Sequence, residues 1–406
     1  MGAFLYLIAL CALQVRYFRA QRIGMEQDVQ SLELEALSSI SQISAAQWDA
    51  LLPGSYPFLR HGFLSVLEES GSVSPATGWR PAHRVMRQDG IVQAILPLYL
   101  KQHSYGEYVF DFQWAEAWER AGRRYYPKLL SAIPFSPVQG PRLLARSADA
   151  AQLLLGNLDE ELLNQRVSSL HLLFNEGDED AWLQQRGWLQ RLGCQFHWFN
   201  REYCSFDDFL AACSSRKRKN FRKERQVIAA QGIEFQWLAG DGISPADWAR
   251  FYPFYAATYL KRGRQPYLSP AFFTLLGETM PEALRLVFAR HQGRDVAGAF
   301  FLVGDNTLYG RYWGCLDEYD RLHFETCFYQ GMERCIAEGL QRFDAGAQGE
   351  HKLLRGFEPV LTQSWHKLQP GLHDAVADFL VQEQEGVRAY RQDAMRYLPY
   401  RREGNG

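Results

Sequence analysis

The stretch Gln341-Arg-Phe-Asp-Ala-Gly-Ala-Gln-Gly-Glu-His-Lys-Leu-Leu-Arg-Gly-Phe-Glu-Pro-Val360 is the most informative part of this 406-residue chain. It starts as a short apolar strand that ends at Asp344, and it then passes through Gly346 and Gly349. Glycine lets the backbone turn tightly and lets a ligand approach closely. Loops at strand ends commonly carry functional groups, and this loop presents Glu350, His351, Lys352 and Arg355. The stretch therefore predicts a strand followed by the loop of a functional site.

The length and composition of the chain indicate a folded protein of two domains. Its 406 residues exceed the size of one ordinary core. With 47% apolar and 22% charged residues, the chain is not largely disordered. The formal net charge of −2 argues against a protein that coats nucleic acid non-specifically. The seven cysteines form no C-x-x-C pair, so neither a zinc ribbon nor a disulfide scaffold is predicted, and we expect no metal site.

The N-terminus contains an apolar run from Phe4 to Leu13 that is too short to span a bilayer. No basic residue precedes the run, as a signal peptide would require. We interpret residues 1–24 as an extension ahead of an internal start at Met25, with a membrane-directing segment as the alternative. The expected location is cytoplasmic without a stable membrane span, and the alternative is peripheral membrane association through this extension.

The order of the predicted elements indicates a duplicated α/β unit, because strands, a helix and a further strand recur in both halves. The predicted domains are residues 25–203 and residues 204–400, joined near residues 201–205. Strands are predicted at 79–86, 91–101, 105–113, 170–174, 195–200, 233–238, 284–290, 296–303 and 307–313. Helices are predicted at 45–52, 58–69, around 125–128, and at 148–164, 180–186, 205–232, 248–260, from 269, and at 324–338 and 373–396.

A basic run at residues 216–225 is the strongest charge cluster in this nearly neutral chain. Phe221 would anchor its helix, so that the cations point outward. We predict phosphate contacts, to a tRNA acceptor end or to a nucleotide-linked precursor. The residues predicted to make them are Arg216, Lys217, Lys219, Arg222 and Lys223. The alternative is a solvated helix face without a ligand.

Several segments together resemble the FemAB-like "peptidoglycan biosynthesis/recognition" group of the Gcn5-related N-acetyltransferase (GNAT) superfamily. The resemblance runs from about Ser55 to Leu398, and the run from Asp344 to Lys352 is specific. The other segments that carry it are 58–64, 124–128, 205–225 and 314–324, the last running into the helix before Gly339. The resemblance implies two tandem GNAT-like domains, each a mixed sheet flanked by helices, with a cleft between them.

The same resemblance implies transfer of an acyl or aminoacyl group to an amine. Fem peptidyltransferases take amino acids from aminoacyl-tRNA and attach them to peptidoglycan precursors. Typical acetyl-CoA-binding GNAT proteins carry a glycine-containing loop before the helix that holds the pyrophosphate. Here residues 317–323 read Asp-Glu-Tyr-Asp-Arg-Leu-His, and an acidic segment without glycine is a poor cradle for phosphates. Aminoacyl-tRNA and acyl-CoA both remain candidate donors, with acyl-CoA less favoured, and no cofactor is required.

Amide formation needs a base for the attacking amine and a donor or cation for the developing oxyanion. We predict His351 or Glu350 as the base. Lys352 would stabilise the oxyanion or hold a carboxylate, and Asp344 would orient the amine. The alternative is a salt-bridge network within the loop, in which Asp344 caps the turn.

The end of the predicted strand 307–313 supplies candidate substrate-binding residues. Alternation along a strand would place Arg311 and Trp313 on one face and Tyr312 on the other. In GNAT-like folds the equivalent strand end lines the cleft, so these residues resemble substrate contacts, with sheet core as the alternative. We add Arg355 as a fixed cation and His323, which is equally a surface cap, at the start of the next helix.

The leading functional prediction is an N-acyltransferase that acts on a small-molecule or peptide amine. The alternative is a non-catalytic module that recognises peptidoglycan precursors or another anionic cell-wall intermediate. The two differ in whether Glu350, His351 and Lys352 converge on the same cavity as Tyr312. Arg262-Gly263-Arg264 is predicted to end a helix and is a candidate second anion contact. The oligomeric state stays open.

Overall fold

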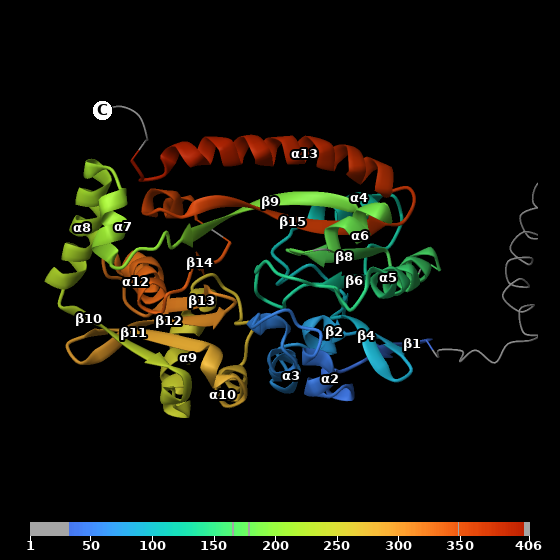
Figure 1. Ribbon diagram of the computed structural model, residues 1–406, viewed down its shortest axis with the longest axis horizontal. Coiled ribbons are helices and arrows are strands. Elements are labelled where there is room, and N and C mark those ends of the chain that lie inside the picture. Colours follow the sequence, from blue (N-terminus) through green and yellow to red (C-terminus); the bar gives the residue numbers. More distant parts are fainter. Residues whose placement is uncertain (1–31, 165, 178, 348, 402–406) are drawn as a thin grey trace, which may run out of the picture.

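The structure is a computed structural model that describes residues 32–401, apart from residues 165, 178 and 348. The predicted extension 1–24 and the proposed start at Met25 lie outside the described residues. Within the described part, helices surround one four-stranded sheet and one eleven-stranded sheet, which confirms the predicted α/β class (Figure 1). None of the helices in this part is long and apolar enough to cross a membrane.

The smaller sheet belongs to the first half of the chain and is antiparallel. Its strand order is β1 (Leu32–Leu37), β3 (His83–Gln88), β4 (Ile91–Leu96), β7 (Leu144–Ala145). The larger sheet runs through both halves. Its strand order is β10 (Ile233–Ala239), β11 (Leu284–His291), β12 (Arg294–Gly304), β13 (Thr307–Cys315), β14 (Arg342–Asp344), β9 (Leu189–Phe199), β15 (Glu358–Leu368), β8 (Ser169–Leu173), β6 (Lys128–Ser131), β5 (Tyr99–Lys101), β2 (Trp79–Pro81).

The two halves exchange strands in the larger sheet. Strand β9 of the first half pairs with β14 and β15 of the second half. Strand β15 in turn pairs with β8, so it lies between two strands of the first half. Among the described strands, β13–β14 and β6–β8 are the parallel pairs of this sheet. The sheet therefore joins the halves through backbone hydrogen bonds.

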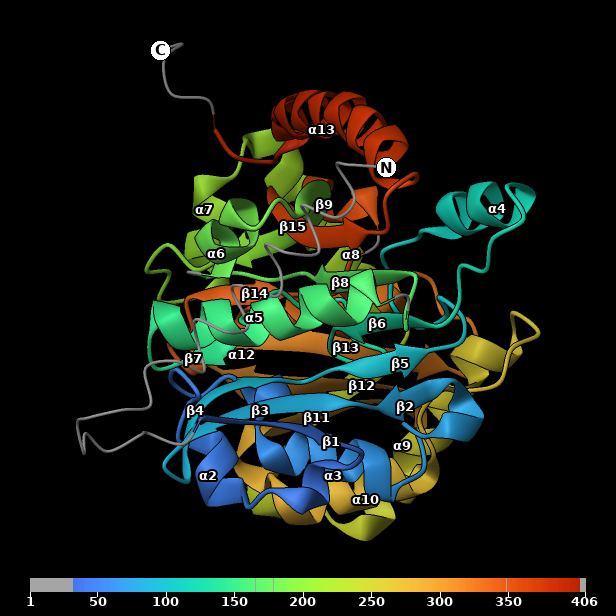
Figure 2. The ribbon, with the colours of Figure 1, turned by 90° about the vertical axis from the view of Figure 1, so that its right-hand side faces the viewer.

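Helices cover the sheets on several sides. The first half contributes α2 (Ala45–Asp49), α3 (His61–Glu69), α4 (Phe112–Arg120), α5 (Ala148–Leu163) and α6 (Glu179–Gln185). The second half contributes α7 (Phe206–Ala212), α8 (Ser215–Ala230), α9 (Pro245–Leu260), α10 (Pro270–Thr279), α11 (Leu322–Phe324), the π-helix η6 (Glu325–Tyr329), α12 (Gln330–Ala337), the 3-10 helix η7 (Glu350–Arg355) and α13 (His373–Ala394). Figures 1 and 2 both show α13 lying along β9 and β15.

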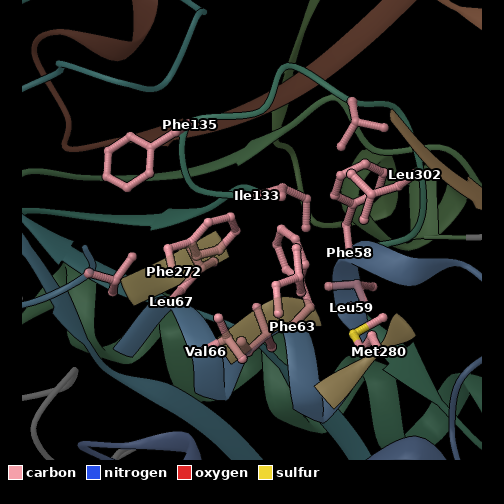
Figure 3. Packing of buried hydrophobic residues seen from close by; sticks show 14 of the residues in the cluster. Phe58, Leu59, Phe63, Val66, Leu67, Ile133, Phe135, Phe272, Met280 and Leu302 are labelled. Atoms are coloured by element: carbon pink, nitrogen blue, oxygen red, sulfur yellow. The ribbon is translucent and has the colours of Figure 1, made fainter. Parts of the chain in front are cut away.

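A hydrophobic core also crosses from one half to the other, where α3 packs against α10 (Figure 3). The rings of Phe63 on α3 and Phe272 on α10 meet edge to face, with centroids 6.1 Å apart. Phe58, ahead of α3, packs in the same way on Tyr309 of β13, at 5.1 Å. Buried aromatic side chains contribute much of the core energy of a protein. This shared core and the shared sheet together fix the position of β13 relative to the first half.

Two predicted elements are wrong. The predicted strand at 105–113 is a loop that leads into α4, and the predicted helix around 125–128 is an irregular segment that enters β6 at Lys128. One buried ion pair underlies both differences, because the ammonium of Lys128 lies 2.7 Å from Glu107 and 2.5 Å from Asp111. Burying this cation is favourable only with carboxylates beside it. The 105–113 segment supplies them and follows an irregular path.

Two further differences concern the second half. The predicted helix 205–232 is interrupted between α7 and α8, where Cys213 pairs with Tyr400 and the Ser214 N–H donates to the carbonyl of Pro399. Strand β15 was not predicted, because its sequence Glu-Pro-Val-Leu-Thr-Gln-Ser-Trp-His-Lys-Leu does not alternate regularly between apolar and polar residues. The strand is instead stabilised by backbone pairing with β8 and β9 of the other half.

Candidate functional site

The parallel strands β13 and β14 separate at the centre of the site. Their pairing ends with Tyr309 opposite Asp344, where β14 stops, while β13 continues to Cys315. A cavity of about 380 Å³, here called the inner chamber, lies at this opening. The predicted site residues that line it are Arg311, Tyr312, Trp313, His323, His351 and Lys352.

A β-bulge at Arg311 changes the directions of the side chains in the last part of β13. On the neighbouring strand, Phe300 lies opposite Tyr312 and Phe301 lies opposite Gly310, so Arg311 has no partner of its own. A bulge interrupts the alternation of side chains along a strand. The prediction that Arg311 and Trp313 share a face is therefore wrong.

The two side chains accordingly have different neighbours. The guanidinium of Arg311 lies 5.3 Å from the ring centroids of Phe58 and Tyr309. The indole of Trp313 instead packs on the ring of His323, with centroids 4.7 Å apart. Both side chains still reach the wall of the inner chamber.

Arg311 and Asp344 form a buried bidentate ion pair, with N–O distances of 2.5 and 3.2 Å. Burial alone would raise the pKa of Asp344, but Arg311 and His197 hold that pKa well below its usual range. The Gly346 N–H donates to the same carboxylate at 2.8 Å. Asp344 does not line the inner chamber. The predicted role of Asp344 in orienting the amine does not fit this position, since it holds Arg311 and the following turn.

Lys352 reaches the inner chamber while holding the loop beside it. Its residue is 2% exposed, and its Nζ donates to the carbonyls of Ala345 and Gly346 at 2.8 and 2.5 Å. Burial lowers the pKa of Lys352 to about 8, with Arg311 acting in the same direction and Asp344 opposing. A lysine with a lowered pKa can exchange a proton near neutrality.

Two histidines face each other at the chamber wall. The ring centroids of His323 and His351 are 5.8 Å apart. Burial is the main cause that lowers the pKa of His323, to about 4, and that lowers the pKa of His351. Lys352 and Arg355 lower both pKa values further. Both imidazoles are therefore neutral at pH 7, so each has a nitrogen that can accept a proton.

The ring of His351 is seated over Gly349, which has a φ of +111°. A Cβ at position 349 would lie 2.4 Å from the His351 ring, closer than real contacts allow. The glycine in the loop is thus required both by its backbone conformation and by the histidine above it.

Two predicted site residues lie outside the inner chamber. Glu350 is exposed and accepts a hydrogen bond from the Tyr390 hydroxyl of α13 at 2.8 Å. Arg355 is buried, donates to Glu224 at 2.7 Å, and lies 3.4 Å over the Phe324 ring. The predicted roles of Glu350 as a base and of Arg355 as a substrate contact therefore do not fit their positions.

The predicted phosphate contacts lie on α8. Among the residues that the structure describes, Arg216, Lys219 and Lys223 are exposed and form no ion pair, whereas Arg222 is 3.3 Å from exposed Asp207. Burial lowers the pKa of Lys217, as do Arg216 and Arg355. Glu224 of α8 accepts a hydrogen bond from Arg355 of η7 at 2.7 Å. The basic helix is thus attached next to the inner chamber.

Several residues of the site were not singled out from the sequence. Cys327 and Phe328 line the inner chamber from the π-helix η6, a local widening that is common at functional sites. Arg262, which the sequence analysis named as a candidate anion contact, also reaches the chamber from the loop after α9. His197 on β9 places its Nε2 3.8 Å from Asp344. A sequence pattern does not reveal a π-helix, and β9 meets β14 only through the exchange of strands.

The start of the α11–η6–α12 helix carries a carboxylate. Glu325 is 2% exposed, and its carboxylate pairs with Arg225 of α8 at 3.0 Å. Arg321 precedes the helix with a φ of +67°. An anionic group is stabilised at a helix N-terminus. Here that group is the carboxylate of Glu325, which belongs to the protein and not to a ligand.

An opening between two parallel strands, beside a helix and within a sheet that runs through two halves, is the arrangement of a tandem GNAT-like protein. The chain belongs to the FemAB-like family, described as peptidoglycan biosynthesis/recognition, whose model matches residues 39–402. This confirms the family that the sequence resembles.

Several solved structures are similar to this chain at low sequence identity. FemX is 11% identical, with 85% of this chain and 99% of that chain covered at a TM-score of 0.50. L-PGS from Bacillus licheniformis is 10% identical, with 83% and 96% covered at a TM-score of 0.47. A tandem GNAT protein from the clavulanic acid biosynthesis pathway is 12% identical, with 83% and 98% covered at 0.43. A comparison with curated proteins found no match. The predicted tandem GNAT-like fold is confirmed.

Proposed function

We propose that this protein transfers an aminoacyl group from aminoacyl-tRNA to the amine of an acceptor, at the inner chamber. The observation that carries the proposal is the convergence of His351, Lys352 and Tyr312 on one cavity at the opening between β13 and β14. Membership of the FemAB-like family supports this chemistry and makes a peptidoglycan precursor a candidate acceptor. The predicted boundary between residues 203 and 204 would divide the chain into the two GNAT-like units.

In this proposal the neutral imidazole of His351 takes a proton from the attacking amine. The amine nitrogen bonds to the acyl carbon, and the carbon–oxygen ester bond to the tRNA breaks. The departing oxygen then receives the proton through His351. Lys352 faces the same cavity and would stabilise the negative charge that develops on the acyl oxygen. Its bonds to Ala345 and Gly346 would hold the amine nitrogen of Lys352 in place for that task.

The basic helix α8 supports aminoacyl-tRNA as the donor, because the ion pair of Glu224 with Arg355 joins α8 to the helical turn that carries His351. Acyl-CoA is less well supported. The start of the α11–η6–α12 helix lacks glycine, and the buried carboxylate of Glu325 already occupies its first turn. A pyrophosphate there would meet a like charge.

A non-catalytic recognition module is the second candidate. The observation in its favour is that Glu350 faces α13, which leaves the inner chamber without a carboxylate among the described residues that line it. In that case the chamber would bind its ligand without turnover, and His351 and Lys352 would be binding groups.

The test measures transfer of radiolabelled amino acids from a mixture of charged tRNAs to peptidoglycan-precursor peptides. We expect His351→Gln to lower the rate by about 10²- to 10⁴-fold, as for the loss of a general base. Glu350→Gln is the matched control at the neighbouring position and should keep the rate. Full activity in both His351→Gln and Lys352→Met would refute the assignment. Binding of the precursor without transfer in the unaltered protein would favour the recognition module.

A further inference from the structure

A second cavity adjoins the inner chamber. It has a volume of about 450 Å³ and is here called the outer chamber. The two chambers share a wall formed by Arg262, Arg311, Tyr312, Trp313 and Ala345. A molecule in the outer chamber would therefore reach the reacting groups across the end of β13.

Aromatic rings form much of the outer chamber. Phe135 and Tyr267 stack with centroids 4.8 Å apart and an angle of 12° between their planes. Three further lining residues, Tyr105, Phe110 and Phe112, are 54%, 56% and 42% exposed, although ring contacts link Tyr105 to Phe112 and Phe110 to Phe112. Clustered, exposed aromatic side chains commonly mark a binding surface. Flat, apolar groups would stack on these rings.

The charged residues that line the outer chamber are all cationic. They are Arg262, Arg264 and Arg311, and no carboxylate belongs to a described residue of the lining. The charge of Arg311 is compensated by Asp344. Arg262 and Arg264 are exposed on the loop after α9, and neither forms an ion pair within the described part of the chain. Two uncompensated guanidinium groups thus stand beside an aromatic surface.

We infer that the outer chamber binds the acceptor and selects one that carries an acidic group next to an apolar group. Arg262 and Arg264 would bind the acid, since guanidinium groups pair well with carboxylates and phosphates. The apolar group would pack on the aromatic surface. The acceptor amine would then extend past Tyr312 and Ala345 into the inner chamber. The identification of the ligand as the acceptor rests on the proposed function. The specificity of the outer chamber for anions does not depend on that function.

The test uses two fluorescent probes with the same rings and full-length protein. The first probe, 8-anilinonaphthalene-1-sulfonate, carries an acid, and the second, N-phenyl-1-naphthylamine, is the same molecule without it. We expect saturable binding of both probes. In the Arg262→Gln/Arg264→Gln variant, the Kd of the acidic probe should rise about tenfold, equivalent to about 1.4 kcal/mol, while the Kd of the neutral probe stays the same.

The control variant Arg294→Gln/Arg388→Gln removes two exposed arginines outside both chambers and should leave both Kd values unchanged. Phe110→Ser/Phe112→Ser changes exposed residues and should weaken both probes alike. Equal binding of the acidic probe by the original protein and the Arg262→Gln/Arg264→Gln variant would overturn the inference. An equal loss in the control variant would also overturn it, because the effect would then be one of net charge.

Displacement experiments identify the acid. If 1-naphthoate displaces the sulfonate probe best, the acceptor carries a carboxylate, and if 1-naphthyl phosphate does, it carries a phosphate. Failure of both compounds to displace the probe would overturn the inference. None of these measurements needs turnover, so a loss of the proposed transfer activity and a failure of the outer chamber to bind anions are distinguishable.

Discussion

The guanidinium of Arg311 and the carboxylate of Asp344 join β13 to the end of β14, where the two parallel strands part. Both side chains are 1% exposed, and the pair is bidentate. The inner chamber begins directly beyond it. The pair therefore joins the two strands at the opening in which His351 and Lys352 lie, and Arg311 also reaches the wall of the chamber.

Removing one partner of this pair should destabilise the protein strongly. Asp344→Asn leaves the buried guanidinium of Arg311 without a counter-charge, so we expect a loss of about 3 kcal/mol in the free energy of unfolding. Chemical denaturation monitored by tryptophan fluorescence measures the loss. The control is Asp393→Asn in the exposed pair with Arg396, where a loss below about 1 kcal/mol is expected. Equal losses in the two variants would contradict the prediction.

The same pair makes stability depend on acid. The pKa of Asp344 in the folded protein lies below the unfolded value of about 3.9. Its contribution is fully present above that unfolded value and is lost as the pH falls through the lower folded pKa. The original protein should thus lose more stability between about pH 4 and pH 2 than Asp344→Asn does. If the free energies of unfolding of the original protein and of Asp344→Asn fell equally over this pH range, the pair would not be the cause of the acid sensitivity.

Lys352 should change stability in the same direction with pH as Asp344, but in the alkaline range. Its folded pKa of about 8 lies below the unfolded value of about 10.4, so the unfolded chain binds more protons between these two values. Stability from this group therefore rises as the pH increases from about 8 to about 10, by on the order of 2 kcal/mol. Lys352→Met should lack this rise when both proteins are denatured at each pH. A variant with the same pH profile would show that the lysine is not desolvated.

Transfer activity should fall in acid because of His351. Because burial lowers the pKa of His351 below the ordinary value of about 6.5, the decline of kcat/KM should be centred below about pH 6.5. His351→Gln should remove this decline along with most of the rate. His373→Gln, on α13, serves as a control that keeps both. A decline that persists in His351→Gln would assign the titration to another group.

The exposed lysines of α8 should contribute to tRNA binding. Lys219→Glu/Lys223→Glu reverses two charges that are unpaired among the described residues, so the Kd for tRNA should rise about tenfold at low salt. The slope of log Kd against log salt concentration should fall by about 1–2. Fluorescence anisotropy measures both quantities. Arg294→Glu/Arg388→Glu changes the net charge equally, and an equal effect there would remove α8 from the binding surface.

Local signals in the sequence predicted much of the second half of the fold. The hydroxyl of Ser205 caps α7 as expected, and Ser269 followed by Pro270 begins α10. The first half was harder, because Lys128 looks like a surface residue and is fully buried beside Glu107 and Asp111. A buried ion pair depends on segments that are distant in sequence, so no local pattern predicts it.

The sequence predicted several of the residues that line the inner chamber, but it did not predict the directions of the side chains. Residues 350–355 form a 3-10 helix, in which successive side chains point about 120° apart. Glu350, His351 and Lys352 therefore cannot all face one cavity. Lys352 and Arg355, three positions apart, point inward together, and the exposed Glu350 turns to Tyr390. The short strand and the glycines predicted a loop, but not this helical turn.

The exchange of β15 has a consequence for how the protein can be divided. A cut near the predicted boundary would leave a fragment 32–203 in which β8 and β9 lose the strand that lies between them. Exposed strand edges of that kind promote aggregation. The halves should therefore be insoluble when produced separately, yet reassemble when synthesised in the same cell. If each fragment were fused to one of two other proteins, binding between those proteins would bring the fragments together. The transfer activity would then report that binding.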